Sequence, residues 1–496
     1  MATQSTEYLS QSLMPAHPGL SNGAGIAAGL AAESYIESLA RIVYYWGYPA
    51  VNTFGRTSVW ETMKNGAGAT MGLFPGGPKN HMGYLDDVMA SSQRRVVTPN
   101  RDTIYGSSII DLSEDSVVIQ TPDKVPEGHY WTIQIVDLFT TVIHQLGSAS
   151  HTPGGKYLLV GPDWEGRTPD GFIEVLHSPT SIAAAFGRSF AGHTQDDMAL
   201  ARRILNQIGV VPLRDDRPGP LVFDCEASAR NAVFPPGLTR EMVTADPDLL
   251  RVRPVNAATF WDDLEKALDA SPKVSADDTP MATQARALLA LRRASSELKS
   301  FIDHVALAAD AELQEGARYY QTGVDTGNGW QRQRNAGAWG ADWYGRAQAA
   351  VIYIYVNDFH EAIYFIRGTD AKGQLLEGRY HYTLTFPKDG LPAVDRSRGG
   401  FWSLTMYDED YYMLAHPDGG RTNIGTAALD AKEVDFAPDG SLTLHLSFAP
   451  PEDPVARKNW LPAPDGKFAL LIRAYVPTDE IASGAYVLPD VVRAVS

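Results

Sequence analysis

Two stretches of nearly the same pattern, residues 130–137 (YWTIQIVD) and 401–408 (FWSLTMYD), decide the fold of this 496-residue chain. Both begin with an aromatic residue, a tryptophan, a small hydroxyl residue and an aliphatic residue, and both end with an aspartate. Short runs of β-branched and aromatic residues are typical of strands. A second strand-like run follows each stretch, KYLLVGPDW in the first case and SLTLHLSFAPP in the second. The repeat predicts an internal duplication, with two related β-sandwiches.

Helical patterns lie before and between these strand series. From Glu33 onward, apolar residues recur every three or four positions, which predicts an amphipathic helix that ends near Gly47 and Pro49. The sequence therefore predicts an α+β multidomain protein. Its expected parts are a flexible leader (1–32), a helical N-terminal region (33–90), a first β-sandwich domain (91–190), a helical connecting region (191–340) and a second β-sandwich domain (341–496).

The composition is that of a globular protein with an excess of acidic residues. Hydrophobic residues make up 44% of the chain and charged residues 20%, which is the range of folded domains. The 42 Lys and Arg residues stand against 59 Asp and Glu residues, so the formal net charge is -17 at pH 7. Because such a surface repels phosphate backbones and anionic membranes, we expect a small-molecule substrate, and neither nucleic acid nor a membrane as a partner.

The cysteine content and the N-terminus bear on location. The single cysteine, Cys225, has no partner for an intramolecular disulfide and is predicted to be a small buried residue. No apolar run reaches the length of a transmembrane helix. The first basic residue is Arg41, so the basic start of a secretory signal is missing. These features predict a cytoplasmic protein, and a homo-oligomer is compatible with them.

Standard catalytic signatures are absent from the sequence. There is no phosphate-binding G-x-x-x-x-G-K-[ST] motif, and residues 187–192 (GRSFAG) have one residue too many for a nucleophile elbow. His360 and Glu361 begin like a zinc-protease helix, but Tyr364 stands where the second histidine is required. The sequence therefore predicts neither a cofactor nor a metal ion.

The densest polar cluster lies at the edge of an apolar strand, at residues 100–105 (NRDTIY). Asp102 is predicted to act as a general acid or base, and Tyr105 as a proton donor. Asn100 and Arg101 are predicted to bind the substrate, with the guanidinium pairing with a carboxylate or polarising an oxyanion. The structural alternative is a turn at Pro99 and Asn100, fixed by an ion pair between Arg101 and Asp102.

Two histidines follow the first repeated stretch. His144 lies seven residues after Asp137, and an imidazole beside carboxylates can shuttle protons near neutral pH, so it is the third catalytic candidate. The alternative is a hydrogen-bonded core histidine. His151 lies in a turn rich in Gly and Ser and is expected at the lip of a site.

Aromatic and basic residues in the second half of the chain form a further set of candidates. Trp339, Trp460 and Arg473 are predicted to bind substrate, because aromatic walls with an arginine suit an organic acid or a sugar face. Sandwich cores and domain interfaces use the same residue types, so Arg473 could equally serve as a buried hydrogen-bond hub. Trp402 is expected in a core.

The combination of motifs resembles a known family. The stretches PNRDTIY (99–105), YWTIQIVD and the G-x-Y-L-L-V-G-P-D-W run at 155–164 are similar to the first domain of the bacterial two-domain family that pairs domains of unknown function twelve fifty-four and twelve fourteen. The second domain resembles FWSLTMYD, NWLPAP (459–464) and LIRAYVP (471–477). The resemblance implies a helical N-terminal part and two jelly-roll-like sandwiches with helices between them. It implies little about activity.

Two classes of function remain open. The first is a cofactor-independent enzyme, of hydrolase or lyase type, that acts on a small organic molecule in a cleft between the β-domains. The second is a non-catalytic binding or assembly protein that recognises a saccharide or a protein partner. An enzyme is expected to bring Asp102, Tyr105 and a histidine into one pocket, whereas a binding protein is expected to present an exposed aromatic surface.

Overall fold

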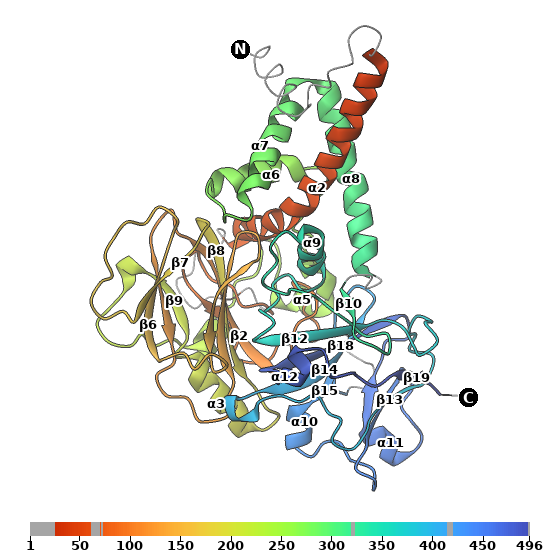
Figure 1. Ribbon diagram of the computed structural model, residues 1–496. Helices are drawn as coiled ribbons and strands as arrows, with labels where there is room; N and C mark the ends of the chain where they lie inside the picture. The colour runs from red at the N-terminus through yellow and green to blue at the C-terminus, as the bar shows by residue number, and fades with distance from the viewer. Residues whose placement is uncertain (1–24, 61–69, 71–72, 319–322, 414–419, 495–496) are drawn as a thin grey trace.

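A computed structural model describes residues 25–60, 70, 73–318, 323–413 and 420–494. A group of long helices projects from one end of the molecule, and two β-rich parts lie side by side at the other (Figure 1). The predicted α+β multidomain architecture with a helical N-terminal part is confirmed. Residues 1–24 of the expected leader lie outside the described residues.

The first described helix, α2 (Gly25–Trp60), is longer than the sequence predicts at both ends. It includes residues 25–32, which were expected in the leader, and it continues through Pro49. A proline inside a helix costs about 3 kcal/mol, but packing offsets this cost because Trp46 and Ala50 are fully buried. Gly47 does not end the helix; a Cβ at this position would lie 2.9 Å from Leu264 Cδ1 of the neighbouring helix, so the glycine permits close packing.

Four further helices pack around α2. Its tryptophan Trp46 donates a hydrogen bond from Nε1 to Oδ1 of Asp278 at 2.8 Å, and Arg346 pairs with the same carboxylate at 2.8 Å. Both partners of this ion pair are buried, so the contact ties the helices at a fixed point. The helices are α6 (Phe260–Ala270), α7 (Thr279–Ala294), α8 (Ser296–Arg318) and α9 (Trp343–Ile352).

The first β-rich part consists of two sheets packed face to face. The order of the first sheet is β1-β2-β8-β4-β5, and that of the second is β7-β6-β3-β9. Apolar residues of both sheets, among them Ile133 and Ile119, share one core. The strands are β1 (Gly83–Tyr84), β2 (Thr103–Asp111), β3 (Val117–Thr121), β4 (Trp131–Asp137), β5 (Val142–Gly147), β6 (Gly155–Val160), β7 (Glu174–His177), β8 (Ile182–Phe190) and β9 (Gly209–Pro212).

The second β-rich part is built in the same way. Its first sheet has the order β10-β11-β12-β18-β14-β15, and its second has the order β17-β16-β13-β19. The two sheets again share a core, to which Leu404 and Leu444 belong. The strands are β10 (Val324–Asp325), β11 (Gln331–Arg332), β12 (Ala362–Arg367), β13 (Tyr382–Phe386), β14 (Phe401–Asp408), β15 (Asn423–Gly425), β16 (Leu442–Ser447), β17 (Trp460–Pro462), β18 (Phe468–Tyr475) and β19 (Val491–Arg493).

The two parts repeat one another strand by strand. The run β2-β8-β4-β5 corresponds to β12-β18-β14-β15, and β7-β6-β3-β9 corresponds to β17-β16-β13-β19. Even the parallel pair recurs, as β6 with β7 and as β16 with β17. Trp131 and Trp402 are 4% and 3% exposed and point into equivalent cores, so the predicted repeat and the core position of Trp402 are confirmed.

The turns after the repeated strands are equivalent too. Asp137 accepts backbone hydrogen bonds on Oδ1 from Phe139 and Thr141, both at 2.9 Å. Asp408 accepts them from the second and fourth residues after it, at 2.9 and 2.8 Å. Burial raises the pKa of Asp137 to about 7 and that of Asp408 to about 6. The aspartate that ends each repeated stretch therefore fixes a turn.

The domain boundaries differ from the predicted ones. Strand β9 belongs to the first sandwich although it lies beyond residue 190, and β10 and β11 join the second although they precede residue 341. Short strands such as these carry little pattern of their own, and pairing places them. The shorter helices are α3 (Gln195–Leu205), α4 (Cys225–Arg230), α5 (Arg240–Ala245), α10 (Thr426–Asp430), α11 (Pro454–Lys458), α12 (Asp479–Ala482) and the 3₁₀ turns η1 (Leu213–Asp215), η2 (Pro247–Leu250) and η3 (Arg396–Arg398).

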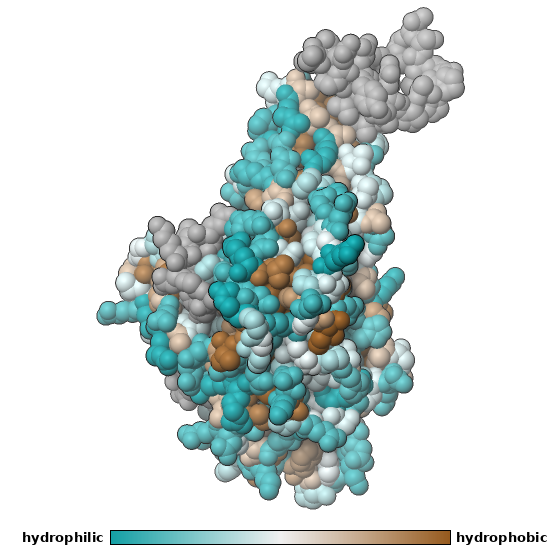
Figure 2. Space-filling view, turned by 90° about the vertical axis from the view of Figure 1, so that its left-hand side faces the viewer, coloured by the Kyte–Doolittle hydropathy of each residue, from teal (hydrophilic) through white to brown (hydrophobic). Residues whose placement is uncertain are grey.

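The surface bears on possible partners. Figure 2 shows one face on which hydrophobic residues form separate patches among hydrophilic ones. Over the described part of the chain, no helix combines the length and the apolar character required to cross a bilayer.

Candidate functional site

The two sandwiches face each other across a cavity. Apolar residues of both, such as Phe186 and Leu471, form a core between the domains that is separate from the core inside each sandwich. Beside this core lies a cavity of about 80 Å³, at the kind of interface between domains where ligand sites are common. Its walls are Arg56, Phe74, Pro75, Met89, Val96, Val97, Thr98, Pro99, Asn100, Tyr105, Phe186, Arg188, Tyr353, Ile354, Tyr355, Val356, Tyr364, Arg473 and Tyr475.

The repeat places the same pair of residues on each side of the cavity. Tyr105 on β2 lies opposite Arg188 on β8, and Tyr364 on β12 lies opposite Arg473 on β18. Residues opposite each other on neighbouring strands share a face of the sheet. Since Trp131 and Trp402 occupy the inner faces, these tyrosines and arginines occupy the faces that look toward the other sandwich.

Arg188 is held by neutral acceptors. It donates from Nη1 to Oδ1 of Asn357 at 3.0 Å and from Nη2 to Oε1 of Gln134 at 2.8 Å. Its guanidinium carbon lies 5.3 Å from the ring centre of Tyr105, which is a cation–π distance. Its Nε is buried and finds no acceptor among the described residues. The guanidinium therefore keeps donor capacity for a ligand.

Arg473 repeats this arrangement from the other side. It donates from Nη2 to the carbonyl oxygen of Thr98 at 2.7 Å and to Oη of Tyr407 at 2.9 Å, and from Nη1 to Oγ1 of Thr405 at 3.2 Å. Each arginine thus reaches a residue a few positions before an equivalent strand of the opposite domain, which is Asn357 before β12 for Arg188 and Thr98 before β2 for Arg473. These contacts fix the position of one domain relative to the other around the cavity.

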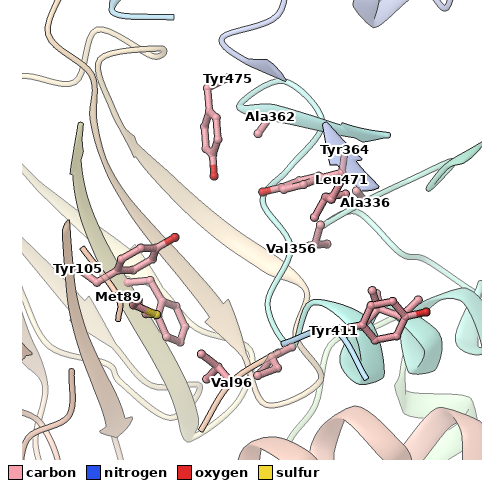
Figure 3. Packing of buried hydrophobic residues seen from close by; sticks show 14 of the residues in the cluster. Met89, Val96, Tyr105, Ala336, Val356, Ala362, Tyr364, Tyr411, Leu471 and Tyr475 are labelled. Carbon is pink, nitrogen blue, oxygen red and sulfur yellow. The ribbon is translucent and has the colours of Figure 1, made fainter. Parts of the chain in front are cut away.

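Three tyrosine hydroxyls converge on the same space. In Figure 3 the hydroxyl ends of Tyr105, Tyr364 and Tyr475 point toward one another across the gap between the domains. Asn100 donates from Nδ2 to Oη of Tyr475 at 3.0 Å, and Asn357 does so to Oη of Tyr364 at 2.7 Å. The hydroxyl of Tyr105 has no hydrogen-bond partner within the described part of the chain, so it is the one most available to a ligand.

The cavity is electropositive. Three arginines line it, Arg56, Arg188 and Arg473, and its described lining contains no aspartate or glutamate. In the described structure none of these three side chains forms an ion pair within 4.0 Å. Guanidinium groups stay protonated when buried, and an uncompensated buried charge is costly, so an anion in the cavity is favoured.

Two buried carboxyl groups lie behind the cavity wall that carries the arginines, and they occupy equivalent positions in the two repeats. Asp102 opens the sequence DTIY at the start of β2, and Glu361 opens EAIY at the start of β12. Asn423 donates from Nδ2 to Oδ1 of Asp102 at 2.8 Å, whereas Tyr130 donates from Oη to Oε1 of Glu361 at 2.5 Å. Each carboxyl is therefore held by the opposite domain.

Burial raises the pKa of both groups. The pKa of Asp102 lies above its usual value because the carboxyl is desolvated, although neighbouring Ser403 and the charge of Arg473 act in the other direction. Desolvation raises the pKa of Glu361 to about 7, against the hydrogen bond from Tyr130. Desolvation thus favours the neutral form of both carboxyl groups.

The cavity gathers three of the residues singled out from the sequence, namely Asn100, Tyr105 and Arg473. Asp102 does not line it; its carboxyl is buried behind the wall, 1% exposed. Arg101 forms no ion pair with Asp102 and instead donates from Nη1 to the carbonyl oxygen of Met89 at 3.1 Å. The proposed turn at Pro99 and Asn100 is present in part, since Asn100 accepts on Oδ1 from the backbone of Asp102 at 2.7 Å.

The other predicted residues lie away from the cavity. His144 on β5 contacts the carbonyl oxygen of His177 at 3.0 Å, and burial lowers its pKa. His151 is an exposed turn residue with a φ of 50°. Trp339 is 1% exposed and donates from Nε1 to the carbonyl oxygen of Thr140. Trp460, on β17 in the second sheet of its sandwich, donates from Nε1 to the carbonyl oxygen of Ser447. The structure does not bring these four residues together.

Sequence reasoning missed Arg188 and Tyr364, although both had a signal. The pattern of an acidic residue, a small residue, isoleucine and tyrosine occurs at residues 102–105 and again at 361–364. An arginine, a small residue and an aromatic residue occur at 188–190 and at 473–475. Extending the repeat from the tryptophan strands to these runs would have found both residues.

The remaining chemistry of the chain is limited. Cys225 is buried as predicted, and burial raises the pKa of its thiol to about 12, so it is a poor nucleophile. Across the described residues, no three His, Cys, Asp or Glu side chains are grouped so that they would hold a metal ion.

Comparison with known proteins agrees with the two-part architecture. Residues 79–212 match the family described as Protein of unknown function (DUF1254), and residues 361–479 match Protein of unknown function (DUF1214). The first match covers β1 to β9 and the second covers β12 to β18. The chain matches no curated protein sequence.

A solved structure has a similar fold. The VPA0106 protein from Vibrio parahaemolyticus has a TM-score of 0.61 at 20% sequence identity, over 93% of this chain and 100% of that one. A putative uncharacterized protein from Burkholderia cenocepacia aligns with a TM-score of 0.42 at 12% identity, over 99% of this chain and 94% of that one, which is too low to establish a common fold. With both domains matched in order, the chain belongs to the family of two-domain proteins that pair DUF1254 with DUF1214.

Proposed function

We propose that this protein binds a small organic anion with an apolar body in the cavity between its two sandwiches. The observation that carries the proposal is the pair Arg188 and Arg473, which reach the same cavity from equivalent strands while no described lining residue is acidic. A carboxylate or a similar oxyanion matches the planar donor geometry of guanidinium groups.

The rest of the lining suits the apolar part of such a ligand. Phe74, Met89, Val96 and Phe186 supply apolar surface at one side of the cavity. Aromatic faces and a flexible methionine accommodate a ring or a short hydrocarbon chain. The converging tyrosine hydroxyls add hydrogen bonds that fix the orientation of the ligand, with Tyr105 as the free donor.

A catalytic role is the second candidate. The ring centre of Tyr105 lies 5.3 Å from the guanidinium carbon of Arg188, so the free tyrosine hydroxyl can deliver a proton to an anion bound at this arginine. This arrangement favours the lyase type over the hydrolase type, because the described lining offers tyrosine hydroxyls but no carboxylate, imidazole or thiol as a nucleophile or base.

Other expectations from the sequence stay proposals. They are a jelly-roll-like course of the chain in each sandwich, a cytoplasmic location, a homo-oligomeric state, and the absence of nucleic acid, membrane, cofactor and metal as partners. Recognition of a saccharide or a protein has less support than an anion, because the aromatic residues Trp339 and Trp402 are buried.

Calorimetric titration with a panel of probes tests the proposal. Benzoate, phenylacetate and succinate serve as anions, and benzyl alcohol and benzamide serve as neutral analogues of the first probe. We expect aromatic carboxylates to bind and their neutral analogues to bind at least about tenfold more weakly, the effect of losing one charge-assisted hydrogen bond. Equal affinity for benzoate and benzamide would contradict the proposal. Product analysis of the same mixtures separates binding from turnover.

A further inference from the structure

A second cavity adjoins the first on the side of the helices. It measures about 320 Å³ and shares Arg56, Val97 and Ile354 with the inner cavity. Residues of α2, α8 and α9 form its walls together with segments 251–254 and 409–412. We name this outer space the vestibule. The vestibule and the inner cavity therefore share a wall.

Arginines dominate the charged lining of the vestibule, and most of them are neutralised. Arg251 pairs with Asp410 at 3.3 Å, and Arg318 pairs with the same carboxylate at 3.6 Å. Arg253 pairs with Asp310 at 3.2 Å. These three arginines therefore have their charge compensated by the protein itself.

The other two arginines are not neutralised. Arg95 is only 8% exposed, and its guanidinium forms no hydrogen bond or ion pair with any residue that the structure describes. Arg56 donates from Nε to Oδ1 of Asn52 at 3.1 Å, a neutral acceptor, and pairs with no described carboxylate. Both side chains line the vestibule. The protein thus holds one buried and one partly buried cationic group and leaves most of their donors for something else.

The two groups also repel each other. Burial lowers the pKa of Arg95 to about 10, and the neighbouring charge of Arg56 acts in the same direction. Burial lowers the pKa of Arg56 as well. An oxyanion placed between them would relieve this repulsion and satisfy the free donors.

We propose that Arg56 and Arg95 form a second anion site, which takes the carboxylate or sulfate-like group of a small molecule at the inner end of the vestibule. The ligand of the inner cavity binds at this site first, before it enters the inner cavity, and that part of the inference rests on the proposed function. The net charge of -17 repels anions at long range. A local pair of uncompensated arginines supplies the attraction that the surface as a whole lacks.

Equilibrium dialysis with radiolabelled sulfate at low ionic strength tests the site directly. We expect Arg95→Gln and Arg56→Gln each to weaken sulfate binding about tenfold or more. Arg253→Gln is the matched control, because it removes an arginine from the same vestibule that Asp310 already neutralises, and we expect it to bind like the wild type. Arg188→Gln, which changes only the inner cavity, is expected to retain the sulfate site.

The outcomes separate this site from the proposed function. Sulfate binding that survives Arg95→Gln, or that Arg253→Gln weakens to the same degree, would overturn the second site. Arg95→Lys guards against a folding defect: it keeps the charge, and we expect sulfate binding to stay closer to that of the wild type than in Arg95→Gln. If sulfate binds at Arg95 but benzoate binds nowhere in the wild type, the proposed function fails and the vestibule site stands.

Discussion

Arg188 and Arg473 occupy equivalent positions in the two repeated domains, and both line the cavity between these domains. Arg188 lies between Tyr105 and Thr132 on its neighbouring strands, and Arg473 lies between Tyr364 and Ser403. Each arginine contacts the domain opposite its own. The cavity is therefore a product of how the two repeats face each other, and neither repeat alone would form it.

The first prediction follows from this equivalence. Arg188→Gln and Arg473→Gln should weaken benzoate binding by similar factors, about ten- to a hundredfold each, because each removes a charge-assisted hydrogen bond. Calorimetric titration measures both. Arg292→Gln is the control, since Arg292 is 5% exposed, is paired with Asp262 and Asp303 on the helices, and does not line the cavity. A loss in Arg292→Gln equal to that in the other two would point to general destabilisation.

The second prediction concerns the free tyrosine hydroxyl. Tyr105→Phe should weaken benzoate binding by about three- to tenfold, the range of one neutral hydrogen bond, without a loss of folding stability. Tyr157→Phe is the matched control, because the hydroxyl of Tyr157 donates to the carbonyl oxygen of Pro153 outside the cavity. Unchanged affinity in Tyr105→Phe would show that this hydroxyl does not contact the ligand.

The third prediction tests the repeat through stability. Trp131→Ala and Trp402→Ala should each cost about 3–5 kcal/mol, because both rings fill equivalent cores. Urea denaturation followed by circular dichroism measures the free energy of unfolding. An unchanged midpoint for one variant and a large loss for the other would mean that the two cores are not equivalent in energy.

The fourth prediction concerns pH. Burial raises the pKa of Glu361 from 4.5 to about 7, so between these values the folded state holds a proton that the unfolded state has released. Stability should therefore fall as pH rises from about 4.5 to 7, by an amount on the order of a few kcal/mol. Glu361→Gln, which imitates the protonated form, should flatten this dependence.

Thermal unfolding at several pH values checks the fourth prediction. The difference between wild type and Glu361→Gln isolates this group from the other buried carboxyls, such as Asp137. Glu315→Gln, which removes an exposed carboxyl on α8, should follow the wild-type curve. Parallel curves for wild type and Glu361→Gln would assign the pH dependence to other groups.

The sequence predicts the fold better than it predicts the site. The tryptophan stretches predict the two sandwiches because strand pairing and burial leave a local pattern of alternating aromatic and aliphatic residues. The predicted end of α2 was wrong because Gly47 and Pro49 are typical helix-ending residues when only the local sequence is considered, whereas Gly47 packs against Leu264. Tertiary contacts therefore determined how far the helix extends.

The site depends on contacts across hundreds of residues, which a local pattern does not report. Asp102 was singled out as catalytic because it stands in a polar cluster, yet Asn423 binds its carboxyl from the other domain. Arg188 sits in a strand in which Ser189 is the only other polar side chain, so no polar cluster marks it. Arg188 and Arg473 line one cavity only because the two repeats face each other in the folded protein.

A crystal structure of the protein grown with a halogenated benzoate tests the central claim most directly. Anomalous scattering from the halogen locates the ligand without ambiguity, and the carboxylate can be placed from it. We expect the ring between Phe186 and Met89 and the carboxylate within hydrogen-bond distance of Arg188 or Arg473. An interdomain cavity that stays empty at a concentration where calorimetry shows saturation, with the halogen bound elsewhere, would contradict the account.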